Sequence, residues 1–349
     1  MARHEVVDET LLRQLAQHHA APVVTVSVPT HRFGPSTTQD RVLMLDLIGR
    51  LALDHDLRAW PEGTVALERL RHEAELVDAQ RALDGLVLYA SARGAGHLAL
   101  SVPVTPRTTV GTHIALGPVI EAVQSLGRAL VVDVNEAGAR AWWKVGPCLT
   151  EILDSGFPYQ AEPEDRLGRS RWDFGRQRTT VELTRRRHVV DDVVGRVTTL
   201  LDERHLPVFA GGNAKSVALL ASDRRLQGRL SSYHLRATNH AGRAELTRAA
   251  HDIDEHLRQR RDQHWALELA KARDARRLAT DLDEITQLVN DGNAAALLLA
   301  SGSPSTDDHA RAVRLDHVMA TMIGRGHDVA IVAGATLGTY GPHALITRH

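Results

Sequence analysis

Cysteine is almost absent from this chain of 349 residues, because Cys148 is the only one. A single cysteine excludes a disulfide within the chain. The first residues lack the apolar stretch of a signal peptide, and no run approaches the roughly 20 apolar residues that a membrane-spanning helix needs. These absences predict a protein of the reducing cytoplasm with no membrane partner.

An excess of either charge is also missing. The chain has 42 basic and 43 acidic residues and a net charge of -1, so its overall charge does not indicate a nucleic-acid partner. Lysine occurs only as Lys144, Lys215 and Lys271, and arginine therefore supplies nearly all of the positive charge. Since arginine is common throughout, we give weight only to places where it clusters.

Common catalytic motifs are lacking as well. The chain has no H-E-x-x-H and no G-x-S-x-G, and its 20 histidines show no standard zinc-ligand spacing. The segment Gly211-Gly212-Asn213-Ala214-Lys215-Ser216 resembles a phosphate loop, but Ala214 and Phe209 stand where that motif needs glycine. We interpret it as a tight turn from a strand into a helix, and we expect no metal and no cofactor.

The apolar content of 43% is sufficient for two or three domains with cores of their own. The order of apolar patterns divides the chain into an α/β domain over 1–120, a central domain over 126–241, and a long linking helix with a small domain over 242–349. In the first domain, apolar spacing and turn residues predict strands and helices in alternation. The strands are 22–28, 86–89 and 97–102, and the helices are 39–57 and 62–83.

The central domain opens with three apolar strands, 129–134, 139–145 and 148–153. The turns between them are so short that neighbouring strands must be antiparallel. Helix 179–203, strand 208–212, helix 214–221 and strand 233–237 follow. This order resembles an RNase H-like sheet.

The last domain begins with a helical tract over 242–278, with a break expected near His264. Helices 282–289 and 310–323 then alternate with strands 294–300, 329–332 and 344–347. Such alternation is typical of an α/β/α sandwich.

A basic segment lies between the central strands and the helix after them. From Arg166 to Arg187 the only acidic residues are Asp173 and Glu182. Arginine binds phosphates through two donors, and aromatic rings stack on bases, so this mixture suits RNA. The alternative is a solvated helix start in an arginine-rich chain. The predicted RNA-binding residues are Arg166, Arg169, Arg171, Trp172, Phe174, Arg176, Arg178 and Arg185.

A second candidate site is the loop after the first strand, where Thr30, His31 and Arg32 precede Asp40. Functional groups often lie at strand ends in α/β folds, and His31 with Asp40 would make an acid-base pair. A loop that caps the next helix through Ser36 or Thr37 is an equally simple explanation.

Three stretches together resemble the family of eukaryotic and archaeal release factor 1 and Pelota, whose bacterial relatives include the hibernation factor Balon. The first is 26–32 with Gln39 and Asp40. The second is 130–133 with 139–142 and Gly156-Phe157-Pro158, and the third runs from 328–332 to 341–346. The resemblance covers nearly the whole chain, and it implies three modules, the last of them L7Ae-like.

The family's catalytic tripeptide Gly-Gly-Gln is absent. Asp165 to Ser170 stands in its expected place, and the only Gly-Gly pair is followed by Asn213. The resemblance therefore implies a ribosome-binding protein that contacts ribosomal RNA near the A site as a hibernation or rescue factor, without hydrolysing peptidyl-tRNA. It also implies tRNA and a translational GTPase such as elongation factor Tu as further partners, and no DNA.

Two other functions remain open from the sequence. A tRNA nuclease or peptidyl-tRNA hydrolase would use clustered carboxylates to hold metal ions, and Asp133 on the first central strand is one candidate ligand, whereas Asp154 and Asp191 show no pattern that would bring them together with it. A stress-linked protein-interaction module would use the helical tract over 242–278 to dock a partner.

Overall fold

We analysed a computed structural model that describes residues 8–31, 36–78, 83–146, 148–161, 176–201, 206–232, 243–302 and 309–349. The chain divides into two compact units. Unit 1 consists of Met1–Ser125 together with Arg258–His349, and unit 2 is Leu126–Leu257. Each unit is described by itself.

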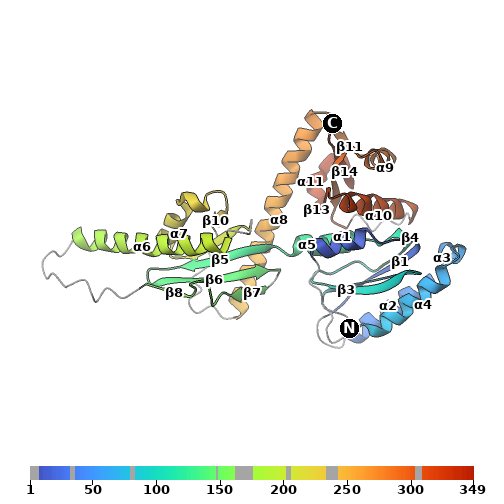
Figure 1. The fold of residues 1–349 in the computed structure, drawn as a ribbon, viewed down its shortest axis with the longest axis horizontal. Coiled ribbons are helices and arrows are strands. Elements are labelled where there is room, and N and C mark those ends of the chain that lie inside the picture. The colour runs from blue at the N-terminus through green and yellow to red at the C-terminus, as the bar shows by residue number, and fades with distance from the viewer. Residues whose placement is uncertain are drawn as a thin grey trace. The chain divides into compact units, whose positions relative to one another are not determined.

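The first sheet of unit 1 is antiparallel, in the order β3-β2-β1-β4 (Figure 1). Its strands are β1 (His19–Pro29), β2 (Gly85–Ser91), β3 (Gly94–Leu100) and β4 (Arg107–His113). Val24 and Val26 of β1 pack against α2 (Ser36–Leu51), α3 (His55–Ala59) and α4 (Gly63–Leu76). Val23 packs on the opposite face with α1 (Glu9–Ala16) and α5 (Gly117–Ser125). Because helices cover both faces, β1 is apolar almost throughout.

The strands predicted over 22–28, 86–89 and 97–102 are confirmed, whereas the two predicted helices are shorter. The helix expected over 39–57 is two helices, because the carboxylate of Asp54 accepts the amides of Asp56 and Leu57 and so starts α3. The helix expected over 62–83 ends at Leu76. The sequence analysis did not predict α1, β4 or α5.

The second sheet lies in unit 2, in the order β10-β9-β5-β6-β7, with β8 paired to β6. Its strands are β5 (Arg128–Val134), β6 (Gly138–Val145), β7 (Cys148–Glu151), β8 (Tyr159–Gln160), β9 (Val208–Gly212) and β10 (Leu230–Ser232). The antiparallel pairing predicted for the first three strands is confirmed. Strand β9 runs parallel to β5, because α6 (Arg176–Leu201) makes the crossover between β8 and β9.

Helices cover both faces of this sheet as well. Val132 packs with Val193 and Val197 of α6, and α7 (Ala214–Ala221) and the short 3-10 helix η3 (Arg224–Leu226) complete that layer. On the other face, Val131 and Phe209 pack with Ile253. The strand predicted over 233–237 lies outside the described residues.

Ile253 belongs to α8 (Arg243–Asp274), a continuous helix, so the break expected near His264 is wrong. The side chain of Lys144 fastens this helix to unit 2, since its ammonium is fully buried and donates to the carboxylate of Asp254 and to the carbonyls of Gly127 and Gly146. The later part of α8 contributes Leu269 to a core of unit 1.

The third sheet, in unit 1, has the order β11-β14-β12-β13. Its strands are β11 (Leu278–Ala279), β12 (Ala294–Ala300), β13 (Asp328–Val332) and β14 (His343–Thr347). Leu297 faces α9 (Leu282–Asn290) and α10 (His309–Gly324), while Leu298 faces α8 and α11 (Gly334–Leu337), which the 3-10 helix η4 (Gly338–Tyr340) follows. This arrangement confirms the predicted α/β/α sandwich.

The first and third sheets share one apolar core. Val23 and Val87 of the first sheet belong to the same cluster as Leu297 and Leu345 of the third, with helices α1, α5, α9 and α10 between and around them. The two ends of the chain therefore fold into a single unit. Within the described ranges, no helix has the length and apolar character to cross a bilayer.

Candidate functional site

The arginine-rich segment lies largely beyond what the structure describes. Arg166, Arg169, Arg171, Trp172 and Phe174 fall outside the described residues. Arg176 and Arg178 stand at the start of α6, and their side chains are not described. The described residues before and within the segment show how it is attached to unit 2.

The upstream side is held by β8 and the turn after it. Gln160 pairs with Gly138 at the start of β6, and the amide of Ala161 donates to the carbonyl of Ala137 at 2.8 Å. The hydroxyl of Tyr159 donates to the carboxylate of Asp192 on α6 at 2.6 Å. The chain therefore enters the segment at the end of the second sheet that carries the β5–β6 turn.

The downstream side is held at the same turn. Arg186 of α6 is only 7% exposed and forms an ion pair with Glu136 of the β5–β6 turn. Helix α6 begins at Arg176, ten residues (186 minus 176) before this contact, or about 15 Å along the helix axis. Ala161, which precedes the segment, and Arg186 of α6 are thus both held at the β5–β6 turn.

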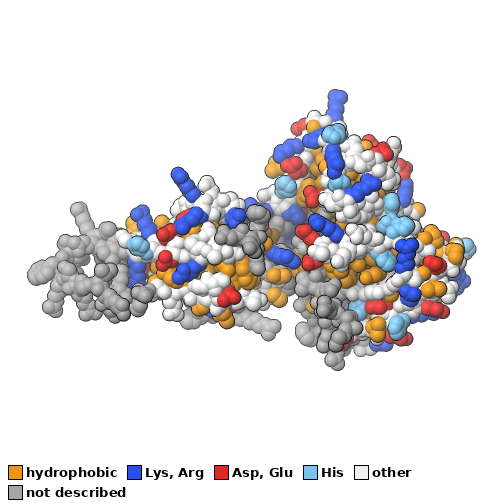
Figure 2. Space-filling model, in the orientation of Figure 1, with side chains coloured by type: hydrophobic (Ala, Val, Ile, Leu, Met, Phe, Trp, Pro, Cys, Tyr) orange, Lys and Arg blue, Asp and Glu red, His pale blue; other side chains and the backbone are white. Residues whose placement is uncertain are grey.

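Two arginines of α6 near this turn differ in their exposure. Arg185, one of the predicted RNA contacts, is half-buried, and its Nε has no hydrogen-bond partner in the described structure. Arg187 is exposed. In the view of Figure 2, basic and acidic side chains alternate over the described surface, in keeping with the net charge of -1. Binding of a polyanion through these residues would therefore depend on the local cluster.

The second candidate site is formed as a hydrogen-bonded pair. Asp40 at the start of α2 accepts the backbone amide of His31 at 2.7 Å, and its other oxygen lies 2.8 Å from Nδ1 of His31. The imidazole side chain is 57% exposed, whereas the carboxylate side chain is 11% exposed. A proton on Nδ1 would leave Nε2 as an acceptor facing solvent.

Thr30 has a structural contact, because its hydroxyl donates to the carbonyl of Leu83 at 2.8 Å. Arg32 lies outside the described residues. The structure thus brings His31 and Asp40 together as predicted, but Asp40 also holds the loop backbone. Whether the pair acts on a ligand stays a prediction.

Carboxylates on the second sheet do not converge. Asp133 is buried on β5, Asp154 is exposed and accepts from Ser155, and Asp191 forms an ion pair with Arg225. Over the described ranges, no three histidine, cysteine or acidic side chains are grouped closely enough to hold a metal ion.

The turn after β9 is a helix cap. The side chain of Asn213 accepts the amides of Lys215 and Ser216 at 3.0 and 3.4 Å, and Lys215 itself is exposed. Gly212 has φ +105°, and a Cβ there would lie 2.3 Å from Oδ1 of Asp133. The interpretation as a tight strand-to-helix turn is confirmed.

A group of titratable residues in unit 1 was missed by the sequence analysis. The rings of His19 and His113 lie 4.8 Å apart, and those of His113 and His317 lie 5.0 Å apart. Burial first, and then the neighbouring histidines, lower the pKa of His113 to about 4. These residues come from β1, β4 and α10, so no local spacing could have revealed the group.

Asp316 lies next to His317 on α10 and is 4% exposed. One of its oxygens is 3.4 Å from a guanidinium nitrogen of Arg107, and the other has no hydrogen-bond partner in the part of the chain that the structure describes. Burial raises the pKa of Asp316 to about 7, although Arg107 acts in the opposite direction. This carboxyl group therefore changes its charge near neutral pH.

Comparison with known proteins gives a match to one family over part of the chain. Residues 130–293, which include all of β6 to β9 and the whole of α8, match the family described as bacterial archaeo-eukaryotic release factor family 3. No curated protein sequence matches the chain.

Several solved structures are similar to this chain over most of its length. Archaeal Pelota, in a model of ribosome-bound Pelota and ABCE1, has 12% identity, covers 99% of this chain and 95% of its own, and gives a TM-score of 0.43. Pelota of Archaeoglobus fulgidus has 13% identity, with 99% and 92% covered and a TM-score of 0.39. The archaeal termination factor aRF1 has 15% identity, with 98% of each chain covered and a TM-score of 0.26.

Proposed function

We propose that this chain is a release factor-like protein that associates with the ribosome and binds ribosomal RNA near the A site as a hibernation or rescue factor, without hydrolysing peptidyl-tRNA. The observation that carries the proposal is the family match over 130–293, which includes the arginine-rich segment. The resemblance of the two ends of the chain to release factor 1 and Pelota extends it to the whole protein.

The anchoring of the arginine-rich segment supports RNA contact. Its two sides are held at the β5–β6 turn by Gln160 and by Arg186. A basic segment anchored at both ends loses less conformational freedom on binding than a free tail does. The guanidinium groups of the segment would contact phosphates, and Trp172 and Phe174 would stack on unpaired bases.

The sequence supports binding without hydrolysis. No Gly-Gly-Gln occurs in the chain, and Asp165 to Ser170 stands in the place that the family's tripeptide occupies. No glutamine follows a glycine pair that would position water against the ester of peptidyl-tRNA. Accordingly, tRNA would be a contact rather than a substrate, and a translational GTPase such as elongation factor Tu is the expected delivery partner.

Sedimentation in a sucrose gradient tests whether the protein binds ribosomes. The purified protein should migrate with purified ribosomes in a sucrose gradient at low salt, and its affinity should fall steeply as salt rises, since phosphate contacts release bound counterions. If the protein stays at the top of the gradient at low salt, and also in lysates of stationary-phase cells, the proposal is wrong.

A triple variant tests the segment. Arg169→Ala, Arg171→Ala and Arg176→Ala together should weaken ribosome binding and lower its salt dependence by about three phosphate contacts. The matched control changes three exposed arginines of α2 and α4, Arg50, Arg69 and Arg71, to alanine. Equal binding by the two triple variants would remove the segment from the interface.

Hydrolysis is tested separately, by incubating the protein with ribosomes that carry labelled peptidyl-tRNA. We expect no release of peptide above the level without protein. Release by the wild-type protein would contradict the non-catalytic part of the proposal and leave ribosome binding untouched.

A further inference from the structure

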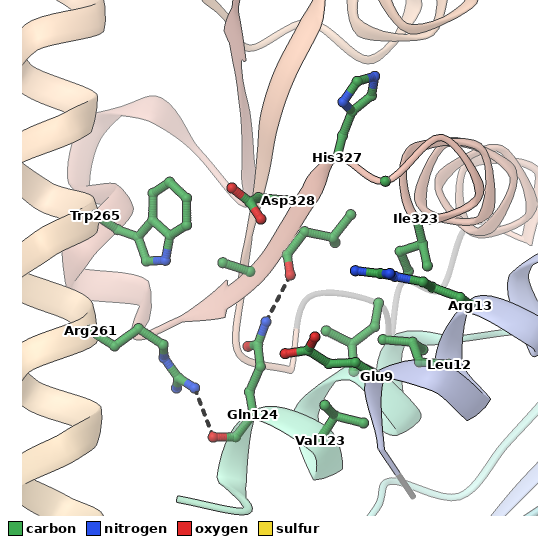
Figure 3. Close-up of a pocket in the computed structure, with 14 residues that line it drawn as sticks. Glu9, Leu12, Arg13, Val123, Gln124, Arg261, Trp265, Ile323, His327 and Asp328 are labelled. Atoms are coloured by element: carbon green, nitrogen blue, oxygen red, sulfur yellow. Dashed lines mark hydrogen bonds between the residues drawn. The ribbon is translucent and has the colours of Figure 1, made fainter. Parts of the chain in front are cut away.

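Unit 1 contains a cavity of about 220 Å³ whose lining includes neither His31 nor Asp40 (Figure 3). Its wall comes from α1, α5, α8, α10 and the start of β13. Leu12, Ile120, Ile323 and other apolar side chains form part of the lining, and charged groups stand among them. A cavity with an apolar wall and a few polar groups is the usual form of a small-molecule site.

Arg261 of α8 is the half-buried cation of this cavity. One of its terminal nitrogens donates to the carbonyl of Gln124 at 3.2 Å, while its Nε is buried and has no hydrogen-bond partner in the described structure. Burial lowers the pKa of Arg261, and Asp262 and Glu121 act on it in the opposite direction without forming a salt bridge in the described part of the chain. Such a guanidinium has donor capacity left for an anion.

Gln124 fixes the wall against which Arg261 lies. Its amide nitrogen donates to the carbonyl of Val329 at 2.7 Å, and its amide oxygen accepts the amide of Ile331 at 2.9 Å. Both ends of this side chain are thus bound to β13. The carbonyl that accepts from Arg261 is consequently held in place before any ligand arrives.

Trp265 stands one helical turn after Arg261, and Figure 3 shows both side chains projecting from α8 toward the cavity. Residues four apart lie on the same face of a helix. The indole is half-buried against the third sheet. An aromatic face beside a guanidinium is the combination that holds a base and its phosphate.

The remaining charges limit the ligand's own charge. Arg13 of α1 and His327 lie at the rim with Arg261, but Glu9 and Asp328 lie there as well. The two carboxylates balance the charge of the two arginines, and burial lowers the pKa of His327, so a ligand with several phosphates is disfavoured. The carboxylates also provide acceptors for N–H groups of a base.

From these contacts we propose that the cavity binds a single nucleotide unit with one phosphate. The base stacks on Trp265, the phosphate contacts Arg261 and Arg13, and Asp328 accepts from an N–H of the base. The cavity is smaller than those that enclose drug-sized molecules, so the sugar stays in solvent. The occupant is a free nucleoside monophosphate or one nucleotide of an RNA strand, and the site does not depend on ribosome binding.

Calorimetric titration of the full chain tests this assignment. The probes are the four nucleoside 5′-monophosphates, the corresponding nucleosides, and a single-stranded RNA of about six nucleotides. Arg261→Gln should weaken monophosphate binding about tenfold and leave nucleoside binding unchanged, because the variant loses only the phosphate contact. Trp265→Leu should weaken both probes about tenfold, since it removes the stacking surface.

The control is Arg314→Gln, on α10, where an exposed arginine pairs with Asp283 outside the cavity. It should bind like the wild type, and circular dichroism should show that all variants are folded. Binding of monophosphates identifies a free nucleotide as the occupant, whereas binding of the RNA alone, lost in both cavity variants, identifies an RNA strand. The proposal is overturned if no probe binds at millimolar concentration, or if binding is the same in all variants.

Discussion

Replacing Asp316 with asparagine should make the stability of unit 1 less sensitive to pH between about pH 4 and 7. The carboxyl group is 4% exposed, and burial raises its pKa from 3.8 to about 7 despite Arg107 at 3.4 Å. One pKa unit corresponds to about 1.4 kcal/mol, so a shift of this size is worth about 4 kcal/mol. In this window the folded chain keeps a proton that the unfolded chain has released, and the free energy of unfolding therefore falls as pH rises. Asparagine stays neutral at every pH, so the variant does not lose stability in this way as pH rises.

The assay is urea denaturation of the wild type and Asp316→Asn at several pH values. The stability of the variant relative to the wild type should rise by about 1.4 kcal/mol per pH unit until the pH reaches about 7, and then level off. A constant offset reports the packing of the amide, so the slope alone reports the charge. Asp283→Asn, which changes an exposed carboxylate, is the control and should show no such slope. A difference that does not vary with pH would refute a raised pKa for Asp316.

Two other predictions concern single residues. His113→Phe keeps a ring beside His19 and His317, but this ring cannot be protonated. In the folded wild type the pKa of His113 is about 4, below its ordinary value of 6.5. The wild type therefore loses stability as the pH falls from about 6.5 through 4. The melting temperature of the variant should fall less than that of the wild type between pH 7 and pH 5, and an equal fall would contradict the buried neutral imidazole. Gly212→Ala should destabilise unit 2 by more than about 1 kcal/mol, because φ is +105° and the new Cβ would meet Asp133 and the carbonyl of Val134; Gly195→Ala on α6, which meets nothing within 4 Å, is the control in thermal unfolding.

Local sequence patterns predicted most strands of the three sheets, because each is an apolar run bounded by turn residues. The short turns 135–138 and 146–147 were enough to predict antiparallel pairing of β5, β6 and β7. The patterns failed where a side chain sets a boundary, as Asp54 does when it starts α3. They also failed for α8, where polar residues around His264 resembled a break although helical propensity carries the helix through.

The candidate sites likewise divide into those that local sequence predicted and those that it did not. His31 and Asp40 are nine residues apart on one loop and helix, and the sequence predicted their pairing. Arg261 and Trp265 were passed over, because a helix alone does not reveal what its face meets. Their cavity exists only where α8 lies against Gln124 and β13.

The sequence by itself determined the α/β class, the antiparallel pairing of β5, β6 and β7, the absence of Gly-Gly-Gln and the resemblance to release factors, since each of these depends on neighbouring residues or short spacings. Only the tertiary structure decided that the two ends of the chain share one core, and that Asp316 meets Arg107 across 209 positions of sequence. Periodicity shows which face of a helix or strand is buried. It does not show which other element packs on that face. The packing of distant elements determines where the buried carboxyl group of Asp316, the group of histidines and the cavity lie.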